Sequence, residues 1–320
     1  MRNAATLQHW DASTARYLAH WRALGRSYRP EEWALGNVRK FLVRHDAEDL
    51  DEALFEAWRA TFRRLSSSSR AKREIAVYNF CRFRRREEPA CFLPNAWTIT
   101  RRQVNAPPTL IGRDQVASLL TYVASLPVIP SIPLRHAVLR IAIVLLYTAG
   151  LRRGELARLT LADVATDAGV LRIRESKFHK SRWVPLSPSA TDELRRYLAA
   201  RHRVHPDPAD DAPLLCRSRG RAFYGEDLCA ALRRPMRRSG IWARPPRVHD
   251  FRHSFAVAAL TRWYQEDGDV QANLPRLALY MGHVSIASTV YYLRLMPEVI
   301  ALAGQRFERA CGALVQGGAA

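Results

Sequence analysis

The chain has 320 residues, of which 48% are hydrophobic and 25% charged, as is normal for a soluble globular protein with one large domain or two ordinary ones. Fifty Lys and Arg against 30 Asp and Glu give a formal net charge of +20, which favours a polyanionic partner, nucleic acid above all. The longest apolar stretch, residues 141–150, is too short to span a bilayer, and no cleavable signal pattern is present, so we expect a cytoplasmic protein without membrane contact.

The cysteines indicate neither a disulfide framework nor a zinc site. Their number is odd, and no C-x-x-C pair occurs. We therefore expect reduced thiols at Cys81, Cys91, Cys216, Cys229 and Cys311.

Residues 1–106 are predicted to be mostly helical. Three segments, 13–25, 30–45 and 49–65, carry apolar residues at helical spacing, and 66–87 is a serine cluster followed by a basic helix. A polar linker follows at 100–110, where Pro107 and Pro108 cannot lie inside a helix. We place the domain boundary there, between 1–106 with a net charge of +8 and 107–320 with +12. Two basic domains would suit a clamp around a duplex.

The second part is predicted to be mainly helical with a small β-structure. Helices are expected over 111–126 and 137–150, and again from 187 onward with a break at 204–213. Between them, residues 169–187 alternate around a polar turn, which predicts a β-hairpin.

Three short motifs in this part carry residues suited to phosphate chemistry. In "TAGLRRGELARL" (148–159), a helix ends at Gly150 and another begins, so Arg152 can face an anion while Glu155 orients its guanidinium. An ordinary surface Arg–Glu pair is the alternative for this motif.

In "RVHDFRHSFAVAAL" (247–260), His249 and Arg252 share one helix face, a pairing of proton transfer with charge neutralisation. His253 follows His249 by four residues, but no third ligand accompanies them, so no metal site is predicted. The third motif, "MGHVSIASTVYYLRL" (281–295), holds His283 and, nine residues later, Tyr292.

Together, "AGLRRGEL", "HDFRH" and "MGH" followed by a tyrosine resemble the tyrosine recombinase/integrase family, over roughly residues 107–310. The resemblance implies a two-domain, C-shaped clamp, mainly α with a small β-sheet or hairpin. Residues 1–106 would be a helical, SAM-like core-binding domain, and 107–320 the catalytic domain with a C-terminal tail helix. It also implies a double-stranded DNA substrate, a tetramer on DNA, and no cofactor or metal. Whether a partner recombinase or an accessory protein is needed is left open.

By resemblance, the catalytic residues are Arg152, Lys177, His249, Arg252, His283 and Tyr292. Lys177 matches the family's β-hairpin lysine, with Lys180 as a rival, and Met281 replaces the usual leucine before "GH". The nine-residue distance from His283 favours Tyr292 over Tyr291, and the two cannot both face one phosphate because a helix turns about 100° per residue.

The resemblance implies that Tyr292 attacks a phosphodiester and forms a 3′-phosphotyrosyl bond. Arg152 and Arg252 would neutralise the transition state with His283 donating a hydrogen bond, Lys177 would protonate the leaving 5′ oxygen, and His249 would accept a proton or position the phosphate. Basic side chains expected on DNA are Arg70, Lys72, Arg73, Arg82, Arg84, Arg101, Arg102, Lys180, Arg182 and Arg247.

The tail beyond Tyr292 has an apolar stripe at Ile300, Ala303, Phe307, Cys311 and Leu314. It packs either into a neighbouring protomer, as the family resemblance implies, or back onto its own domain.

Three other functions are compatible with part of this pattern. A type IB topoisomerase shares the chemistry, a non-catalytic clamp would share the fold, and an RNA-binding protein would share only the charge. Among recombinases, the tail sequence favours a mobile-element integrase over an Xer-like resolvase of chromosome or plasmid dimers.

Overall fold

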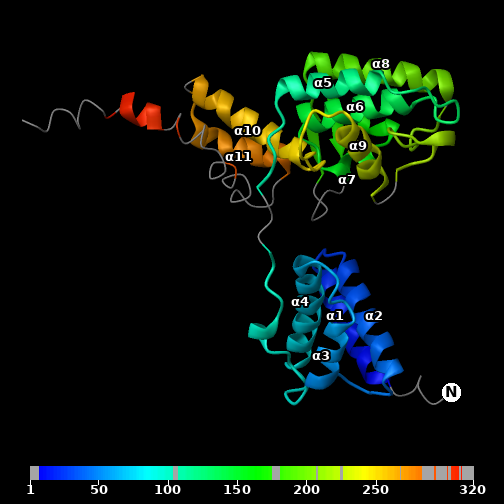
Figure 1. Cartoon of the computed structure of the whole chain (residues 1–320), viewed down its shortest axis with the longest axis vertical. Coiled ribbons are helices and arrows are strands. Elements are labelled where there is room, and N and C mark those ends of the chain that lie inside the picture. The colour runs from blue at the N-terminus through cyan, green and yellow to red at the C-terminus, as the bar shows by residue number, and fades with distance from the viewer. Residues whose placement is uncertain are drawn as a thin grey trace, which may run out of the picture. The chain divides into compact units, whose positions relative to one another are not determined.

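In a computed structural model of the chain, the structure describes residues 7–103, 107–174, 181–206, 208–223, 226–266, 268–282, 292, 301, 304–309 and 311. These residues are mostly helical, with one small antiparallel sheet, which confirms the predicted fold class. The chain divides into two compact units, Met1–Ala106 and Pro107–Ala320 (Figure 1). No helix in the described part of the chain is both long and apolar enough to cross a membrane.

The first unit is a bundle of the helices α1 (Gln8–Ala23), α2 (Arg29–Arg44), α3 (Glu52–Ala60) and α4 (Ser67–Arg84) (Figure 1). Helix α2 packs on α4, α1 packs on both, and α3 packs on α2. Asp51 and Ser66 cap α3 and α4 by accepting hydrogen bonds from backbone N–H groups in the first turn. The core is rich in aromatic side chains, among them Trp10, Tyr17, Phe55, Trp58 and Phe80.

Two contacts anchor the chain on either side of the segment 101–110. After the 3-10 turn η1 (Ala96–Thr98), Thr100 donates from its backbone N and its Oγ1 to the fully buried Glu74 carboxylate, at 2.6 and 2.8 Å. Arg59 Nε lies 3.4 Å from Glu74 Oε1. In the second unit, the backbone N–H of Ile111 donates to Ser254 Oγ at 2.8 Å, in a buried environment.

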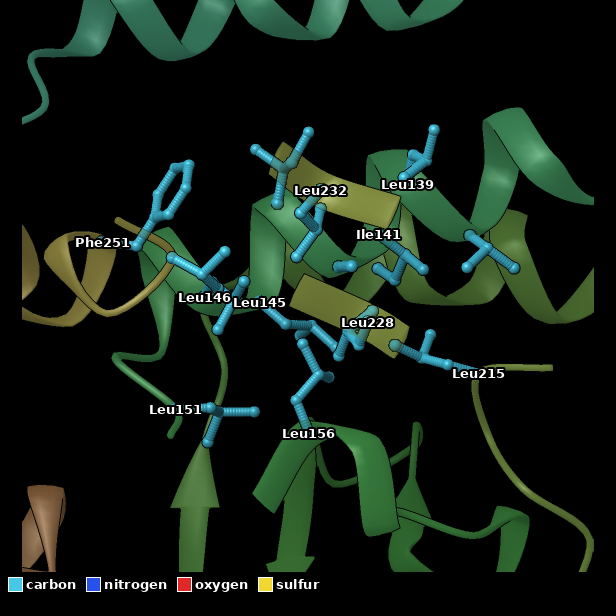
Figure 2. Close-up of a cluster of buried hydrophobic side chains, with 14 of the residues drawn as sticks. Leu139, Ile141, Leu145, Leu146, Leu151, Leu156, Leu215, Leu228, Leu232 and Phe251 are labelled. Atoms are coloured by element: carbon cyan, nitrogen blue, oxygen red, sulfur yellow. The ribbon is translucent and has the colours of Figure 1, made fainter. Parts of the chain in front are cut away.

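Helix α6 (Arg135–Thr148) forms the centre of the second unit. It contacts α5 (Arg113–Ala124), α7 (Arg153–Arg158), α8 (Pro188–Val204), α9 (Asp227–Arg238) and α10 (Asp250–Gln265). Every residue from Ile141 to Leu146 is buried, as expected for a helix that is apolar all round. Figure 2 shows Ile141 and Leu145 of α6 gathered with Leu156 of α7 and Leu228 of α9.

The sheet has the order β1-β2-β3, with β1 (Val164–Ala165), β2 (Val170–Ile173) and β3 (Arg182–Pro185) all antiparallel. Leu171 pairs with Val184 on the buried face, and Arg172 pairs with Trp183 on the exposed face. The predicted hairpin is therefore confirmed. The short turns η2 (Leu161–Asp163) and η3 (Ser218–Gly220) complete the connections, and α11 (Val270–Met281) packs on α10 and on β3.

Candidate active site

Arg152 stands at the junction of α6 and α7, where the chain turns at Gly150. Gly150 has a φ of +57°, and a Cβ there would lie 2.5 Å from Phe255 Cδ1, so the turn requires glycine. Arg152 donates from Nη1 to Glu155 Oε1 at 2.6 Å and from Nη2 to the carbonyl oxygen of Gly282 at 2.6 Å. The Arg–Glu contact expected from the three-residue spacing is thus present, with the Glu155 side chain only 2% exposed.

Arg252 lies in the first turn of α10 and is 1% exposed. Its Nη1 donates to the carbonyl oxygen of Gly150 at 2.6 Å, and its Nη2 to that of Met281 at 2.5 Å. Burial, together with the positive charge of Arg152, lowers the pKa of the Arg252 guanidinium to about 10, so it stays protonated at pH 7. Arg152 and Arg252 therefore meet at the end of α11, on successive carbonyl groups.

Two histidines lie beside these arginines. His249 directly precedes α10 and is exposed, and its ring meets the His253 ring edge-on with 4.8 Å between centroids. Although part of His249 reaches solvent, the protein atoms around its ring desolvate it and lower its pKa, and the charge of Arg252 lowers the pKa further. The imidazole of His249 is therefore neutral at pH 7 and able to accept a proton.

Tyr292 is 3% exposed and belongs to the apolar cluster formed by α10 and α11. Its ring lies edge-on to the ring of His253, with 5.4 Å between centroids. The Tyr292 phenol is also near enough to Arg252 to act on the pKa of that guanidinium. Arg252 and Tyr292 are thus both buried in this structure.

Four residues singled out from the sequence lie outside the described residues. They are Lys177, Lys180, Tyr291 and His283. Most of the tail lies outside them as well; of its apolar stripe, Phe307 is 63% exposed and Cys311 is partly buried, while Ile300, Ala303 and Leu314 are among the residues not described.

Some basic residues expected on DNA line one concave surface of the first unit. Lys72, Arg73 and Arg102 line a cavity together with Trp33, which is 52% exposed. The Arg73 guanidinium carbon lies 4.4 Å from the centre of the Trp33 ring. Of the others, Arg82, Arg101 and Arg247 are exposed, and Arg70 is half-buried.

Two of those basic residues are not available to DNA in this structure. Arg84 is 4% exposed, and its guanidinium makes a bidentate contact with Asp49 and further hydrogen bonds to Glu88. Arg182, with a side chain 10% exposed, makes a bidentate contact with Glu155. Both guanidiniums are therefore buried and engaged by carboxylates in this structure, and their contact with DNA stays a prediction.

Arg182 belongs instead to the candidate site. Burial alone would raise the pKa of the Glu155 carboxyl, but hydrogen bonds and charges from Arg182 and Arg152 outweigh it and lower the pKa to about 2. Sequence spacing could not reveal the contact of Arg182 with Glu155, since the two residues are far apart in the chain. Across the described residues, no three His, Cys, Asp or Glu side chains come together as a metal ion would require.

The model of the phage integrase family matches residues 110–298, which include the arginine, histidine and tyrosine motifs. The chain belongs to the phage integrase family. It is a tyrosine-type site-specific recombinase, which confirms the resemblance drawn from the motifs.

Relatives of this family align along most of the chain. A Sinorhizobium fredii protein named as an integrase/recombinase, y4rB, is 34% identical over 304 residues, covering 92% of this chain and 95% of its own. Tyrosine recombinase XerD of Caulobacter vibrioides is 30% identical over 281 residues, covering 83% and 85%.

Among solved structures, the fold is similar to that of the Tn1549 transposon integrase in complex with circular intermediate DNA. The TM-score is 0.62 at 16% identity, with 88% of this chain and 94% of the other covered. XerH recombinase bound to its difH substrate has a TM-score of 0.59 at 19% identity, covering 88% and 78%. These recombinases therefore share the fold of this chain.

Proposed function

We propose that the chain cleaves and rejoins DNA strands through a 3′-phosphotyrosyl intermediate, with Tyr292 as the nucleophile. The observation that supports this is the convergence of Arg152, Arg252 and Tyr292 from three separate segments. Both guanidiniums reach the end of α11, and Tyr292 packs on α10 beside Arg252 and His253. Two fixed arginines beside a tyrosine match the needs of attack on a phosphodiester.

In the proposed reaction, Tyr292 Oη forms a bond to phosphorus and the bond from phosphorus to the 5′ oxygen breaks. His249 accepts the phenolic proton, and Lys177 donates a proton to the leaving 5′ oxygen. Attack by a 5′-hydroxyl of another strand reverses these steps and releases the tyrosine. Each step replaces one phosphoester bond with another, so the reaction needs no ATP.

The remaining roles follow from charge. A pentavalent phosphate gathers negative charge on its non-bridging oxygens, and Arg152 and Arg252 each supply paired N–H donors to them. His283 adds a hydrogen bond to the same oxygens. Glu155 acts indirectly, by fixing the Arg152 guanidinium.

We further propose that both units contact double-stranded DNA, as a core-binding domain over 1–106 and a catalytic domain over 107–320 that clamp the duplex. Both units are basic, and Lys72, Arg73 and Arg102 share a cavity with Trp33. A tetramer on two DNA sites, linked through the tail, completes the proposed assembly.

Covalent trapping tests the proposal. The DNA site comes from the ends of the surrounding element and carries a nick beside the cleavage position, so the released fragment diffuses away. Wild type, Tyr292→Phe and Tyr291→Phe are compared on a denaturing gel. We expect an adduct in wild type and Tyr291→Phe, and none in Tyr292→Phe. An adduct lost only in Tyr291→Phe contradicts the choice of nucleophile, and DNA binding without any adduct supports a non-catalytic clamp.

The biological role we propose is that of a mobile-element integrase, supported by similarity to y4rB and to the Tn1549 integrase fold. Similarity to XerD favours dimer resolution as the second candidate. Plasmids with two directly repeated sites, compared with pairs of plasmids that carry one site each, separate the two. An integrase joins the separate plasmids, whereas a resolvase mainly excises between the repeats.

A further inference from the structure

The C-terminal end of α11 accepts hydrogen bonds from three arginines of three different elements. Arg182 Nε donates to the carbonyl oxygen of Tyr280 at 2.7 Å, Arg252 Nη2 to that of Met281 at 2.5 Å, and Arg152 Nη2 to that of Gly282 at 2.6 Å. Carbonyl groups in a last helical turn lack partners within the helix and carry its partial negative charge. This end of α11 is therefore a fixed point around which the candidate site is assembled.

Arg182 differs from the other two arginines in how its nitrogens are used. Its Nη1 and Nη2 donate to Glu155 Oε1 and Oε2, at 3.0 and 2.9 Å, while Nε holds Tyr280. All three nitrogens of Arg182 thus donate to the protein. This arrangement favours a residue that holds its neighbours in place rather than one that contacts DNA.

Glu155 connects Arg182 to Arg152. Its Oε1 accepts hydrogen bonds from Arg182 Nη1 at 3.0 Å and from Arg152 Nη1 at 2.6 Å, and its Oε2 accepts one from the backbone N of Arg152 at 2.9 Å. The direction in which Arg152 points is thus set by a carboxylate that Arg182 holds. Three guanidiniums against one carboxylate leave the cluster net positive, as the binding of an anion requires.

The turn after α11 passes close to the guanidinium groups of Arg182 and Arg152. Gly282 has a φ of +66°, and a Cβ there would lie 2.8 Å from Arg182 Nη1 and 3.4 Å from Arg152 Nη1. Because glycine has no Cβ, the backbone at Gly282 approaches both arginines more closely than a residue with a Cβ could. Arg182 is also the first residue of β3, so the same contacts fix the start of that strand.

We propose that Arg182 is a positioning residue for DNA strand cleavage: it holds Glu155, and through Glu155 it aims the Arg152 guanidinium at the scissile phosphate. This inference rests on the proposed function. It predicts that loss of Arg182 impairs the neutralisation of phosphate charge while DNA binding is kept. Misplacement of a catalytic group by about 1 Å costs about 100-fold in rate.

The test compares wild type, Arg182→Met, Arg182→Lys and the control Arg195→Met in single-turnover cleavage at saturating DNA. Arg195 lies on α8 and pairs with Asp192 of the same helix, so its loss removes one positive charge from the same unit without touching the site. We expect cleavage by Arg182→Met to fall about 100-fold, with the Kd for DNA within about threefold of wild type. Arg182→Lys restores part of the rate, because lysine keeps the charge but loses the bidentate contact. Arg195→Met cleaves like wild type.

Two modified substrates show which step is affected. A methylphosphonate at the scissile position removes the charge that Arg152 neutralises, whereas a 5′-bridging sulfur leaves readily without the proton that Lys177 supplies. We expect the defect of Arg182→Met to shrink to less than about tenfold on the methylphosphonate and to persist on the sulfur substrate. Each comparison uses one preparation on two substrates, so a partly unfolded variant lowers both rates equally and leaves their ratio unchanged.

The outcomes separate this inference from the proposed function. No Tyr292 adduct from wild type overturns the proposed function itself. With the wild-type adduct present, three results overturn the role of Arg182: a normal rate in Arg182→Met, an undiminished defect on the methylphosphonate, or rescue by the bridging sulfur, which would assign the effect to leaving-group protonation.

Discussion

The ring of His253 meets the ring of Tyr292 edge-on, with 5.4 Å between their centroids. Nδ1 of His253 is buried and has no hydrogen-bond partner among the residues that the structure describes. Burial, followed by the neighbouring His249, lowers the pKa of His253 to about 4. The imidazole that packs on the candidate nucleophile is therefore neutral at pH 7.

This depressed pKa predicts a stability that falls as the pH falls. The unfolded chain binds a proton at His253 near pH 6.5, whereas the folded chain binds it only near pH 4, so the free energy of unfolding decreases between these values, by about 1 kcal/mol per pH unit at most. Urea unfolding between pH 7 and pH 4.5 measures it. His253→Phe keeps a ring against Tyr292 and should reduce this dependence, leaving the contribution of His249, whose pKa is also lowered. His202→Gln, on the exposed side of α8, should keep the wild-type slope.

Glu155→Gln is expected to destabilise the protein. The substitution leaves Arg152 and Arg182 without their shared carboxylate, and breaking a buried ion pair costs about 3 kcal/mol or more in the free energy of unfolding. Urea unfolding at pH 7 gives the difference. As a matched control, Glu226→Gln breaks an ion pair with Arg153 at a position 68% exposed, and should change stability by less than about 1 kcal/mol. Equal effects of the two substitutions would contradict the bridging role of Glu155.

Glu155 also has its own pH window. The pKa of Glu155 in the folded chain, about 2, lies below its ordinary value of 4.5, so its stabilisation is present above pH 4.5 and is lost as the pH falls toward 2. The acid unfolding midpoint should therefore lie at a higher pH in Glu155→Gln than in wild type.

Gly282→Ala and Gly240→Ala form a matched pair. Both glycines have positive φ, +66° and +68°, so each alanine costs about 1 kcal/mol in backbone strain. A Cβ at Gly240 meets open space, whereas at Gly282 it displaces Arg182 and Arg152. We expect only Gly282→Ala to lower single-turnover cleavage, by about tenfold or more. Equal cleavage by both variants would show that the close approach at Gly282 is unimportant.

Lys72 and Arg84 should respond in opposite ways, although both are cations of α4. Lys72 is exposed at the cavity with Trp33, so Lys72→Met should reduce the slope of log K against log salt for DNA binding by about one. Arg84 is buried against Asp49 and Glu88, so Arg84→Met should lower the free energy of unfolding by about 3 kcal/mol and leave the salt slope unchanged. Salt titrations of DNA binding, paired with urea unfolding, check both.

Sequence patterns predicted the elements that local periodicity encodes. The apolar run of α6 and the alternation of β2 and β3 could be recognised because their period reflects their burial. Strand β1, Val164–Ala165, was missed because two residues are too few to show any period. The segment 49–65 has helical spacing throughout, but α3 ends at Ala60.

Long-range ion pairs explain which contacts of the site could not be predicted from the sequence. An arginine was expected to be exposed, and spacing along the chain can reveal only local partners. Glu88 lies four residues after Arg84, a spacing that indicates an ion pair within a helix. The many basic residues of α4 favoured the interpretation of Arg84 as a DNA contact instead. No local signal existed for Asp49, or for the contact of Arg182 with Glu155, because the fold alone brings those residues together.

The hydrogen bonds of Thr100 with Glu74 and of Ile111 with Ser254 define the length of the tether that joins the two units. If each unit holds DNA, as proposed, binding by one makes binding by the other intramolecular, at an effective concentration that depends on this length. Under that proposal, Glu74 affects the combined affinity of the two units through its hold on Thr100, although it is buried. Freeing Thr100 would lengthen the tether and weaken the cooperation between the two halves, while each half keeps its own affinity.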